Sequence, residues 1–265
     1  MKKRIDVMLF EKNFASSREK ARSLITDRLV FVNGKEVKKF SEKYDEDEMI
    51  EIKPGGLPYV SRGGLKLEKA LKNFNIDLSG KISMDVGAST GGFTDCMLMN
   101  GCDKVYSVDV GHDQLNKKLL NDARVVNLEK TNIRNIEPSL VKDRITFFTV
   151  DVSFISLTLV MEPIRNIIET GAIGVCLIKP QFEVGKENIG KNGIVKDKKL
   201  HIFAINKVCD FCVENGFAVL ALDYSPIKGP EGNIEYLVLV KKSETPYIDE
   251  FVDIENMVED SHEKL

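Results

Sequence analysis

Short apolar runs suited to β-strands recur beyond residue 80, and stretches with helical spacing separate the earlier runs. The seven expected strands are residues 82–86, 104–108, 125–128, 145–150, 173–178, 218–223 and 234–240. Strands that alternate with helices predict an α/β fold with a doubly wound, mostly parallel sheet that binds ligands at the carboxyl ends of its strands. Only a short loop separates the last two runs, so we expect them to form an antiparallel hairpin.

The first 58 residues show a different pattern, with short elements and frequent turn signals. Ser16 or Ser17 is suited to cap a helix with apolar residues along one face. Asn33-Gly34 lies between β-prone residues and predicts a hairpin, and residues 49–52 read as a further short strand. The turn-rich stretch 54–58 is typical of a linker. We therefore expect a small α+β domain at 1–58, a larger domain at 59–243 and a tail at 244–265.

Charge is distributed unevenly along a chain whose net charge is only -3. Residues 1–43 contain 12 Lys and Arg but 6 Asp and Glu, whereas residues 243–265 contain 1 Lys and 8 Asp and Glu. A basic N-terminal segment followed by a nearly neutral remainder indicates an anionic partner such as RNA. A solvated basic helix face would give the same distribution of charge.

The apolar content and the cysteines argue against a membrane or secreted protein. No run of 18 apolar residues exists, and Met1-Lys-Lys-Arg-Ile-Asp6 leads into no apolar stretch suited to a signal peptide. The count of five cysteines is odd, and their spacing forms no disulfide or zinc framework. Cys209 and Cys212 have redox-pair spacing, but they also share an apolar helix face, which favours buried thiols. We expect a cytoplasmic protein without a metal site.

The clearest candidate for chemistry is the glycine-rich turn Asp85-Val-Gly-Ala-Ser-Thr-Gly-Gly-Phe-Thr-Asp95. Gly87, Gly91 and Gly92 would let the backbone approach a ligand closely. The spacing differs from the Gly-x-Gly-x-x-Gly of dinucleotide folds, and Asp85 suits a positively charged ligand group. This predicts a pocket for the amino-acid end of S-adenosylmethionine, with Asp109, at the end of the next strand, on the ribose. The alternative is an ordinary tight turn.

Four charged residues occupy positions where charge is costly unless it is paired or useful. Asp151 and Lys179 each follow a buried apolar run, Lys66 lies near the start of the first helix of the second domain, and Glu235 opens the last strand. In a doubly wound sheet, Asp151 and Lys179 would meet at the ligand edge. A structural ion network at that edge remains the alternative.

Two resemblances make these patterns specific. The N-terminal pattern Ser-Arg-x-x-Ala-x-x-Leu-Ile…Val-x-Val-Asn-Gly-Lys resembles the small RNA-binding domain of the ribosomal protein S-four type, the alpha-L motif. The Lys-Asp-Lys-Glu order resembles FtsJ-like (RrmJ-like) ribose 2′-O-methyltransferases. Together with Tyr59-Val-Ser-Arg-Gly-Gly-Leu-Lys-Leu67, Asp151-Val-Ser-Phe-Ile-Ser-Leu157 and Lys179-Pro-Gln-Phe-Glu183, it is similar to the TlyA family over nearly the whole chain.

That resemblance implies a Rossmann-like methyltransferase domain of seven strands with an antiparallel last strand and S-adenosylmethionine as cofactor. The implied substrate is cytidine ribose in 16S ribosomal RNA, 23S ribosomal RNA or both. The implied catalytic residues are Lys66, Asp151, Lys179 and Glu235. The expected cofactor contacts are Asp85, Gly87, Gly91, Gly92, Phe93, Asp109 and Asn132. The expected RNA contacts are Arg4, Arg18, Lys20, Arg22, Arg28, Lys35 and Arg62.

The chemistry of a ribose hydroxyl fits this set of residues. Its proton must leave as the oxygen attacks the methyl group, so Lys179 would either accept the proton or remain charged and stabilise the developing alkoxide. Asp151 would orient Lys179, and Glu235 would anchor Lys66. Two other interpretations stay open, namely an RNA-binding ribosome assembly factor without catalysis and a cytolysin, the name haemolysin having been used in this family. We expect a monomer.

Overall fold

The computed structural model describes residues 2–15, 17–26, 29–52 and 58–265. Two compact units make up the chain, residues 1–62 and residues 63–265. Ser16, Arg28 and most of the stretch predicted to be a linker lie outside the described residues.

The first unit is built from short strands and two helices. Its elements are β1 (Lys2–Arg4), α1 (Ile5–Glu11), α2 (Arg18–Thr26), β2 (Val30–Val32), β3 (Lys35–Glu36), β4 (Lys43–Asp45) and β5 (Ile50–Ile52). Ser17 caps α2 by accepting a hydrogen bond from the Lys20 amide at 3.1 Å. Asn33 and Gly34 both have positive φ and turn the predicted hairpin between β2 and β3. The sequence did not predict the pairing of β1 with β4.

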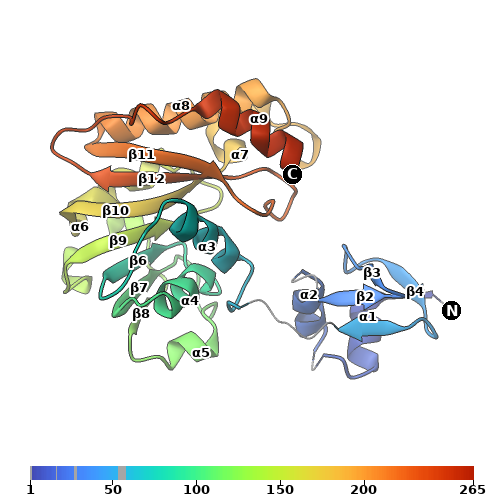
Figure 1. Ribbon diagram of the computed structural model, residues 1–265. Coiled ribbons are helices and arrows are strands. Elements are labelled where there is room, and N and C mark those ends of the chain that lie inside the picture. Colours follow the sequence, from blue (N-terminus) through green and yellow to red (C-terminus); the bar gives the residue numbers. More distant parts are fainter. Residues whose placement is uncertain (1, 16, 27–28, 53–57) are drawn as a thin grey trace. The chain divides into compact units, whose positions relative to one another are not determined.

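The second unit is centred on a seven-stranded sheet, as predicted (Figure 1). Its strands are β6 (Ile82–Val86), β7 (Lys104–Val108), β8 (Val125–Leu128), β9 (Ile145–Val150), β10 (Ile168–Ile178), β11 (Phe217–Tyr224) and β12 (Tyr236–Lys242). Their spatial order is β11-β12-β10-β9-β6-β7-β8. The last strand, β12, inserts between β10 and β11 and runs antiparallel to both. Pairing of β11 with β12 was predicted, but the insertion was not.

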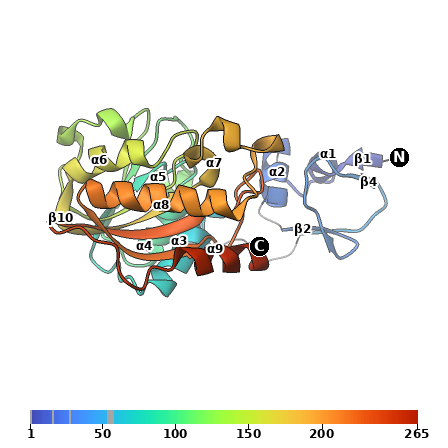
Figure 2. The same ribbon diagram turned by 90° about the horizontal axis from the view of Figure 1, so that it is seen from above.

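Helices cover both faces of this sheet (Figure 2). The helices are α3 (Gly63–Asn73), α4 (Gly92–Met99), α5 (Lys117–Leu120), α6 (Thr158–Ile167), α7 (Pro180–Glu183), α8 (Lys198–Glu214) and α9 (Ile254–Lys264). Helices α3 and α4 pack together on one side, whereas α6 and α8 contribute to a shared apolar core on the other. Cys209 and Cys212 lie fully buried in this core, and burial raises the pKa of Cys209 to about 12, so the prediction of buried thiols is confirmed.

The acidic C-terminal segment folds back onto the second unit. Backbone hydrogen bonds join Val219 of β11 to Tyr247 at 2.8 Å and to Asp249 at 2.9 Å. Helix α9 then packs against α8 and β11, with Val258 and Ser261 buried. Within the described part of the chain, no helix is long and apolar enough to cross a membrane.

Candidate active site

Sheet topology brings the four charged residues to one edge. Asp151 directly follows β9 and Lys179 directly follows β10, and these two strands are parallel neighbours. Because β12 runs antiparallel to β10, its first residue Tyr236 pairs with Ile178, the last residue of β10. Glu235 therefore reaches the same edge, although it lies one residue before the strand rather than opening it. Lys66, in the first half of α3, completes the group.

The four side chains form a continuous chain of ion pairs. The ammonium of Lys66 lies 2.6 Å from Glu235 Oε2 and 3.2 Å from Asp151 Oδ2. The other oxygen of Asp151 lies 2.6 Å from the ammonium of Lys179. Lys66, Lys179 and Glu235 are each at most 8 % exposed, so these charges attract one another with little screening by water.

The charges in this chain stabilise one another. Burial acts to lower the pKa of Lys66, but the adjacent carboxylates of Asp151 and Glu235 outweigh it and raise that pKa above its usual value. Burial acts to raise the pKa of Asp151, and the ammonium groups of Lys66 and Lys179 reverse it, so this pKa is lowered. Lys66 is consequently held as a cation and Asp151 as an anion.

Lys179 also contacts the loop that follows β9. Its ammonium donates a hydrogen bond to Ser153 Oγ at 3.0 Å. The next residue, Phe154, has φ of 63° and is 88 % exposed, and its ring lies 5.4 Å from that of Phe182. An exposed aromatic ring in the left-handed region of backbone space is unusual, which makes this loop a candidate for function.

A pocket of about 580 Å³ opens beside the ion pairs, within the size range of small-ligand sites. Its wall includes Gly87, Ser89, Asp109, Val110, Asn132 and Asp151. Gly87 has φ of 85°, and a Cβ there would lie 2.5 Å from the carbonyl oxygen of Asp151. Only glycine therefore allows β6 and β9 to end this close together. Asp109 accepts hydrogen bonds from the amides of Ser89 and Gly111, both at 2.7 Å, so its carboxylate is fixed.

The structure places other predicted cofactor residues differently. Asp85, Gly91, Gly92 and Phe93 are not among the residues that line the pocket. Asp85 is fully buried, with its two oxygens accepting hydrogen bonds from Thr94 at 2.7 Å and Thr149 at 2.9 Å. Burial raises the pKa of Asp85 to about 6 despite these bonds. Direct contact of Asp85 with a cofactor amine stays a prediction.

Packing accounts for the second glycine of the turn. Gly91 has φ of 93°, and a Cβ there would lie 2.2 Å from Leu119 Cδ1 and 2.8 Å from Leu115 Cδ1. The lining residues that sequence reasoning missed include Val110, Gln114, Thr131 and Arg134. Three of them are polar and close to Asp109 or Asn132 in the sequence, which was the signal available.

In the first unit, Asp6 gathers three of the predicted RNA contacts. Its fully buried carboxylate lies 3.0 Å from Arg4 and 3.1 Å from both Arg18 and Arg22. Burial acts to raise the pKa of Asp6, but hydrogen bonds from the three arginines outweigh it and lower that pKa to about 2. The three arginine side chains remain one-third to one-half exposed. Sequence analysis did not identify Asp6.

The two lysines predicted to contact RNA, Lys20 and Lys35, are exposed in this unit. Arg62 lies at its end, and Arg28 falls outside the described residues.

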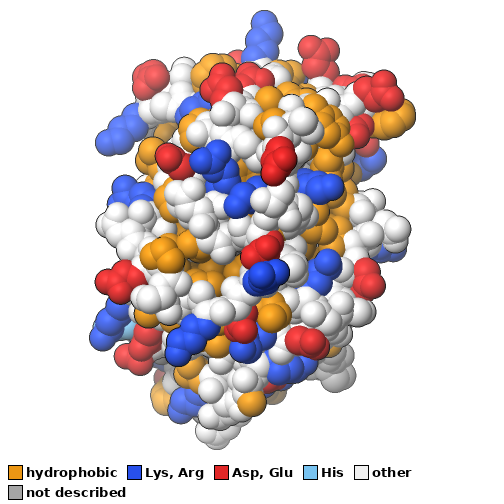
Figure 3. Space-filling model, turned by 90° about the vertical axis from the view of Figure 1, so that its left-hand side faces the viewer, with side chains coloured by type: hydrophobic (Ala, Val, Ile, Leu, Met, Phe, Trp, Pro, Cys, Tyr) orange, Lys and Arg blue, Asp and Glu red, His pale blue; other side chains and the backbone are white. Residues whose placement is uncertain are grey.

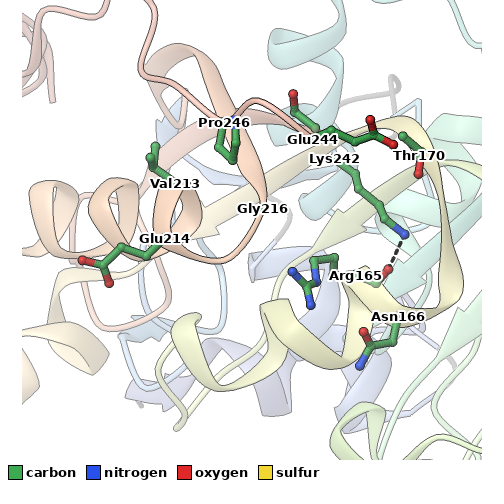
Figure 4. A pocket seen from close by; sticks show the side chains of 10 residues that line it. Arg165, Asn166, Thr170, Val213, Glu214, Gly216, Lys242, Glu244 and Pro246 are labelled. Carbon is green, nitrogen blue, oxygen red and sulfur yellow. Dashed lines mark hydrogen bonds between the residues drawn. The ribbon is translucent and has the colours of Figure 1, made fainter.

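A second pocket, of about 670 Å³, lies at the opposite edge of the sheet (Figure 4). There Lys242 donates hydrogen bonds to the carbonyl oxygens of Arg165 at 2.7 Å and Ile168 at 2.8 Å. On the face of the molecule toward which β12 points, positive and negative side chains are interspersed (Figure 3). The Lys242 ammonium in this pocket is thus already hydrogen-bonded to backbone carbonyl oxygens. The charged groups suited to catalysis lie at the other edge of the sheet.

Comparison with known proteins agrees with this arrangement. The model of the FtsJ-like methyltransferase family matches residues 59–242, and that of the S4 domain matches residues 3–50. The chain belongs to the FtsJ-like methyltransferase family. Its seven-stranded sheet is accordingly the Rossmann-like methyltransferase fold, with the S4 domain at the N-terminus.

Relatives extend the similarity to nearly the whole chain. YqxC of Bacillus subtilis, described as a candidate rRNA methyltransferase, is 46 % identical over 89 % of this chain and 85 % of its own. TlyA of Mycobacterium tuberculosis, a 16S/23S rRNA (cytidine-2′-O)-methyltransferase, is 37 % identical over 90 % of this chain and 89 % of its own. A solved Streptococcus thermophilus protein described as a candidate hemolysin has a TM-score of 0.80 at 43 % identity, covering 99 % of this chain and 96 % of its own.

Proposed function

We propose that this protein transfers a methyl group from S-adenosylmethionine to a cytidine ribose 2′-hydroxyl in 16S ribosomal RNA, 23S ribosomal RNA or both, in the cytoplasm. The observation that carries the proposal is the buried chain of ion pairs from Glu235 through Lys66 and Asp151 to Lys179, in which Asp151 also lines the pocket. Family membership and the substrate in the name of the Mycobacterium tuberculosis relative support the same reaction.

The pocket suits the cofactor. Its volume, the tight approach at Gly87 and the fixed carboxylate of Asp109 fit a nucleoside whose ribose diol needs an acceptor. Asp109 retains accepting capacity because a carboxylate has about four lone-pair sites and two are used. We assign Asp109 to the ribose and Asn132 to the adenine edge. Bound S-adenosylmethionine supplies a methyl group on a positively charged sulfur.

The ion pairs support separate roles for the residues proposed to act on the acceptor hydroxyl. Lys66 is held as a cation by two carboxylates, so its role is to fix Asp151 and not to take a proton. Lys179, which contacts both Asp151 and the exposed Ser153, is the group that would accept the hydroxyl proton or stabilise the alkoxide. Much of the rate would come from holding the oxygen in line with the methyl group.

RNA would be held at two places. In the first unit, Arg4, Arg18 and Arg22 share one carboxylate, so the cluster keeps a surplus of positive charge for phosphates. In the second unit, the exposed ring of Phe154 beside the pocket offers a surface on which a base turned out of its helix can stack.

The test is methyl transfer from labelled S-adenosylmethionine to undermodified small and large ribosomal subunits, assayed separately. Wild type is compared with Lys179→Ala and with Lys142→Ala, a control that removes an exposed lysine. Label on a ribose that is lost only in Lys179→Ala, with cofactor binding retained, is the expected result. Cofactor binding without label on either subunit would contradict the proposal and favour an assembly factor, and leakage of liposomes would favour a cytolysin.

A further inference from the structure

One short segment, residues 179–183, contacts both ends of the loop that follows β9, residues 151–157. At the first end, Lys179 contacts Asp151 at 2.6 Å and Ser153 at 3.0 Å. At the second end, Glu183 accepts a hydrogen bond from the Leu157 amide at 2.7 Å and another from Ser156 Oγ at 2.6 Å. Phe154, with its positive φ, lies between the two attachments.

Glu183 is built into the protein as a hydrogen-bond acceptor. It is only 4 % exposed, and each oxygen of its carboxylate has at least one donor. Its third partner is Lys207 of α8, whose ammonium lies 3.1 Å from Oε2 and 2.9 Å from the Glu183 carbonyl oxygen. Leu157 precedes the first residue of α6, so its amide is among those that a helix start leaves without an intrahelical partner. A buried carboxylate satisfies this amide strongly.

We infer that Glu183 is a positioning residue of the methyl-transfer site, and this inference rests on the proposed function. Lys179 and Glu183 lie four residues apart on the segment that contains α7. Their distances to the loop therefore fix where Ser153 and Phe154 stand relative to the Lys179 ammonium. Glu183 is neither one of the residues that line the pocket nor a member of the ion-pair chain, and it acts through Ser156 and Leu157. A left-handed Phe154 persists only while its surroundings over-determine it, and Glu183 supplies the second attachment.

A purely structural role would look different. If Glu183 only joined α7 to α8, its important partner would be Lys207, and Lys207→Met would reproduce the defect of Glu183→Ala. If it positions the loop, Glu183→Gln should restore most of the function, because the amide oxygen still accepts from Leu157 and the amide nitrogen can donate to Ser156.

The experiment measures turnover at saturating RNA, affinity for S-adenosylmethionine, and hydrogen exchange of the Leu157 amide in the full-length protein. Glu183→Ala is expected to lower turnover at least roughly tenfold, because a small misplacement near the reacting atoms is costly. It should also speed exchange at Leu157 while cofactor affinity changes far less. Glu183→Gln, Lys207→Met and Glu187→Ala, a control at an exposed glutamate of the next turn, should remain close to wild type.

Wild-type turnover and exchange in Glu183→Ala, or equal defects in Lys207→Met and Glu183→Ala, would overturn the inference. If Glu183→Ala fails to fold, Ser156→Ala removes one donor and leaves the carboxylate in place. Its turnover should then fall, and an unchanged value would count against loop positioning. If the wild-type protein methylates neither subunit, the proposed function fails, whereas exchange at Leu157 still reports whether Glu183 holds the loop.

Discussion

Removal of the Lys66 ammonium should lower the free energy of unfolding of the second unit. Lys66→Met keeps an unbranched side chain of similar length but leaves two carboxylates without their shared cation. Asp151 still has Lys179 at 2.6 Å, so the loss falls on Glu235, whose side chain is only 1 % exposed. Glu235 would then be a buried charge without a counterion.

The size of the effect follows from the geometry. At 2.6 Å, two unit charges attract by about 6 kcal/mol if the effective dielectric constant is about 20. Water and small rearrangements recover part of this, and breaking a buried ion pair from one side typically costs about 3–5 kcal/mol. We therefore expect Lys66→Met to lower the free energy of unfolding of the second unit by about 3–5 kcal/mol.

A second substitution separates the effect of Lys66→Met on stability from its effect on activity. Replacing Glu235 by Gln in the Lys66→Met background removes the unpaired charge, so the double variant should regain about 2–3 kcal/mol. It should remain inactive because Asp151 loses one of its two ammonium partners. Urea unfolding followed by circular dichroism measures the first quantity, and methyl transfer to ribosomal subunits measures the second.

The first unit provides an internal reference, since its own unfolding transition should be unaffected by either substitution. The reasoning would be refuted if the double variant were as unstable as Lys66→Met alone. A loss below about 1 kcal/mol in Lys66→Met would refute it as well, because only an exposed ion pair is worth so little.

Three further predictions concern stability. Gly91→Ala should lower the free energy of unfolding by about 2–3 kcal/mol because its Cβ would lie 2.2 Å from Leu119. Gly171→Ala, at a positive φ with nothing within 4 Å, should cost only about 1 kcal/mol in the same urea assay. Equal losses would contradict the packing argument. The pKa of Asp85 is raised by burial from 3.8 to about 6, so between these pH values the folded state binds a proton that the unfolded state has released. As pH rises through that interval, the stability of wild type should therefore fall by about 2–3 kcal/mol relative to that of Asp85→Asn. A constant difference in stability across the interval would show that Asp85 does not titrate there. The pKa of Asp6 is lowered from 3.8 to about 2, so its contribution is fully present above pH 3.8 and disappears as pH falls toward 2. Asp6→Asn should therefore destabilise the first unit at neutral pH but not at the acid end, as hydrogen exchange in α1 would show, and equal destabilisation at both ends would be the contrary result.

The positions of the strands were predictable from local sequence. Apolar runs of strand length predicted all seven strands of the large sheet, with differences mainly at their ends. The start of β10 at Ile168 was missed because its pairing with β9 is interrupted by a register shift between Ile168 and Ile173. Such an interruption depends on the neighbouring strand, which local sequence does not specify.

Candidate chemistry was predictable where charge follows an apolar run. Asp151 and Lys179 stand out for that reason, and the structure brings them together at 2.6 Å. Asp6 and Glu183 gave no such signal, because an acid within a charged or helical stretch is usually exposed. Their burial is revealed only by partners distant in the sequence, Arg22 for Asp6 and Leu157 for Glu183.

The sequence by itself thus determined the kinds of elements, the glycine-rich turn and the residue types available for catalysis, since these depend on neighbours along the chain. Tertiary structure decided which charges meet. Lys66 reaches Asp151, 85 residues away, because the first half of α3 lies beside the end of β9, and it reaches Glu235 because β12 inserts antiparallel beside β10. Burial then removes water from between these charges, and only this long-range packing turns four ordinary ionisable side chains into one coupled site.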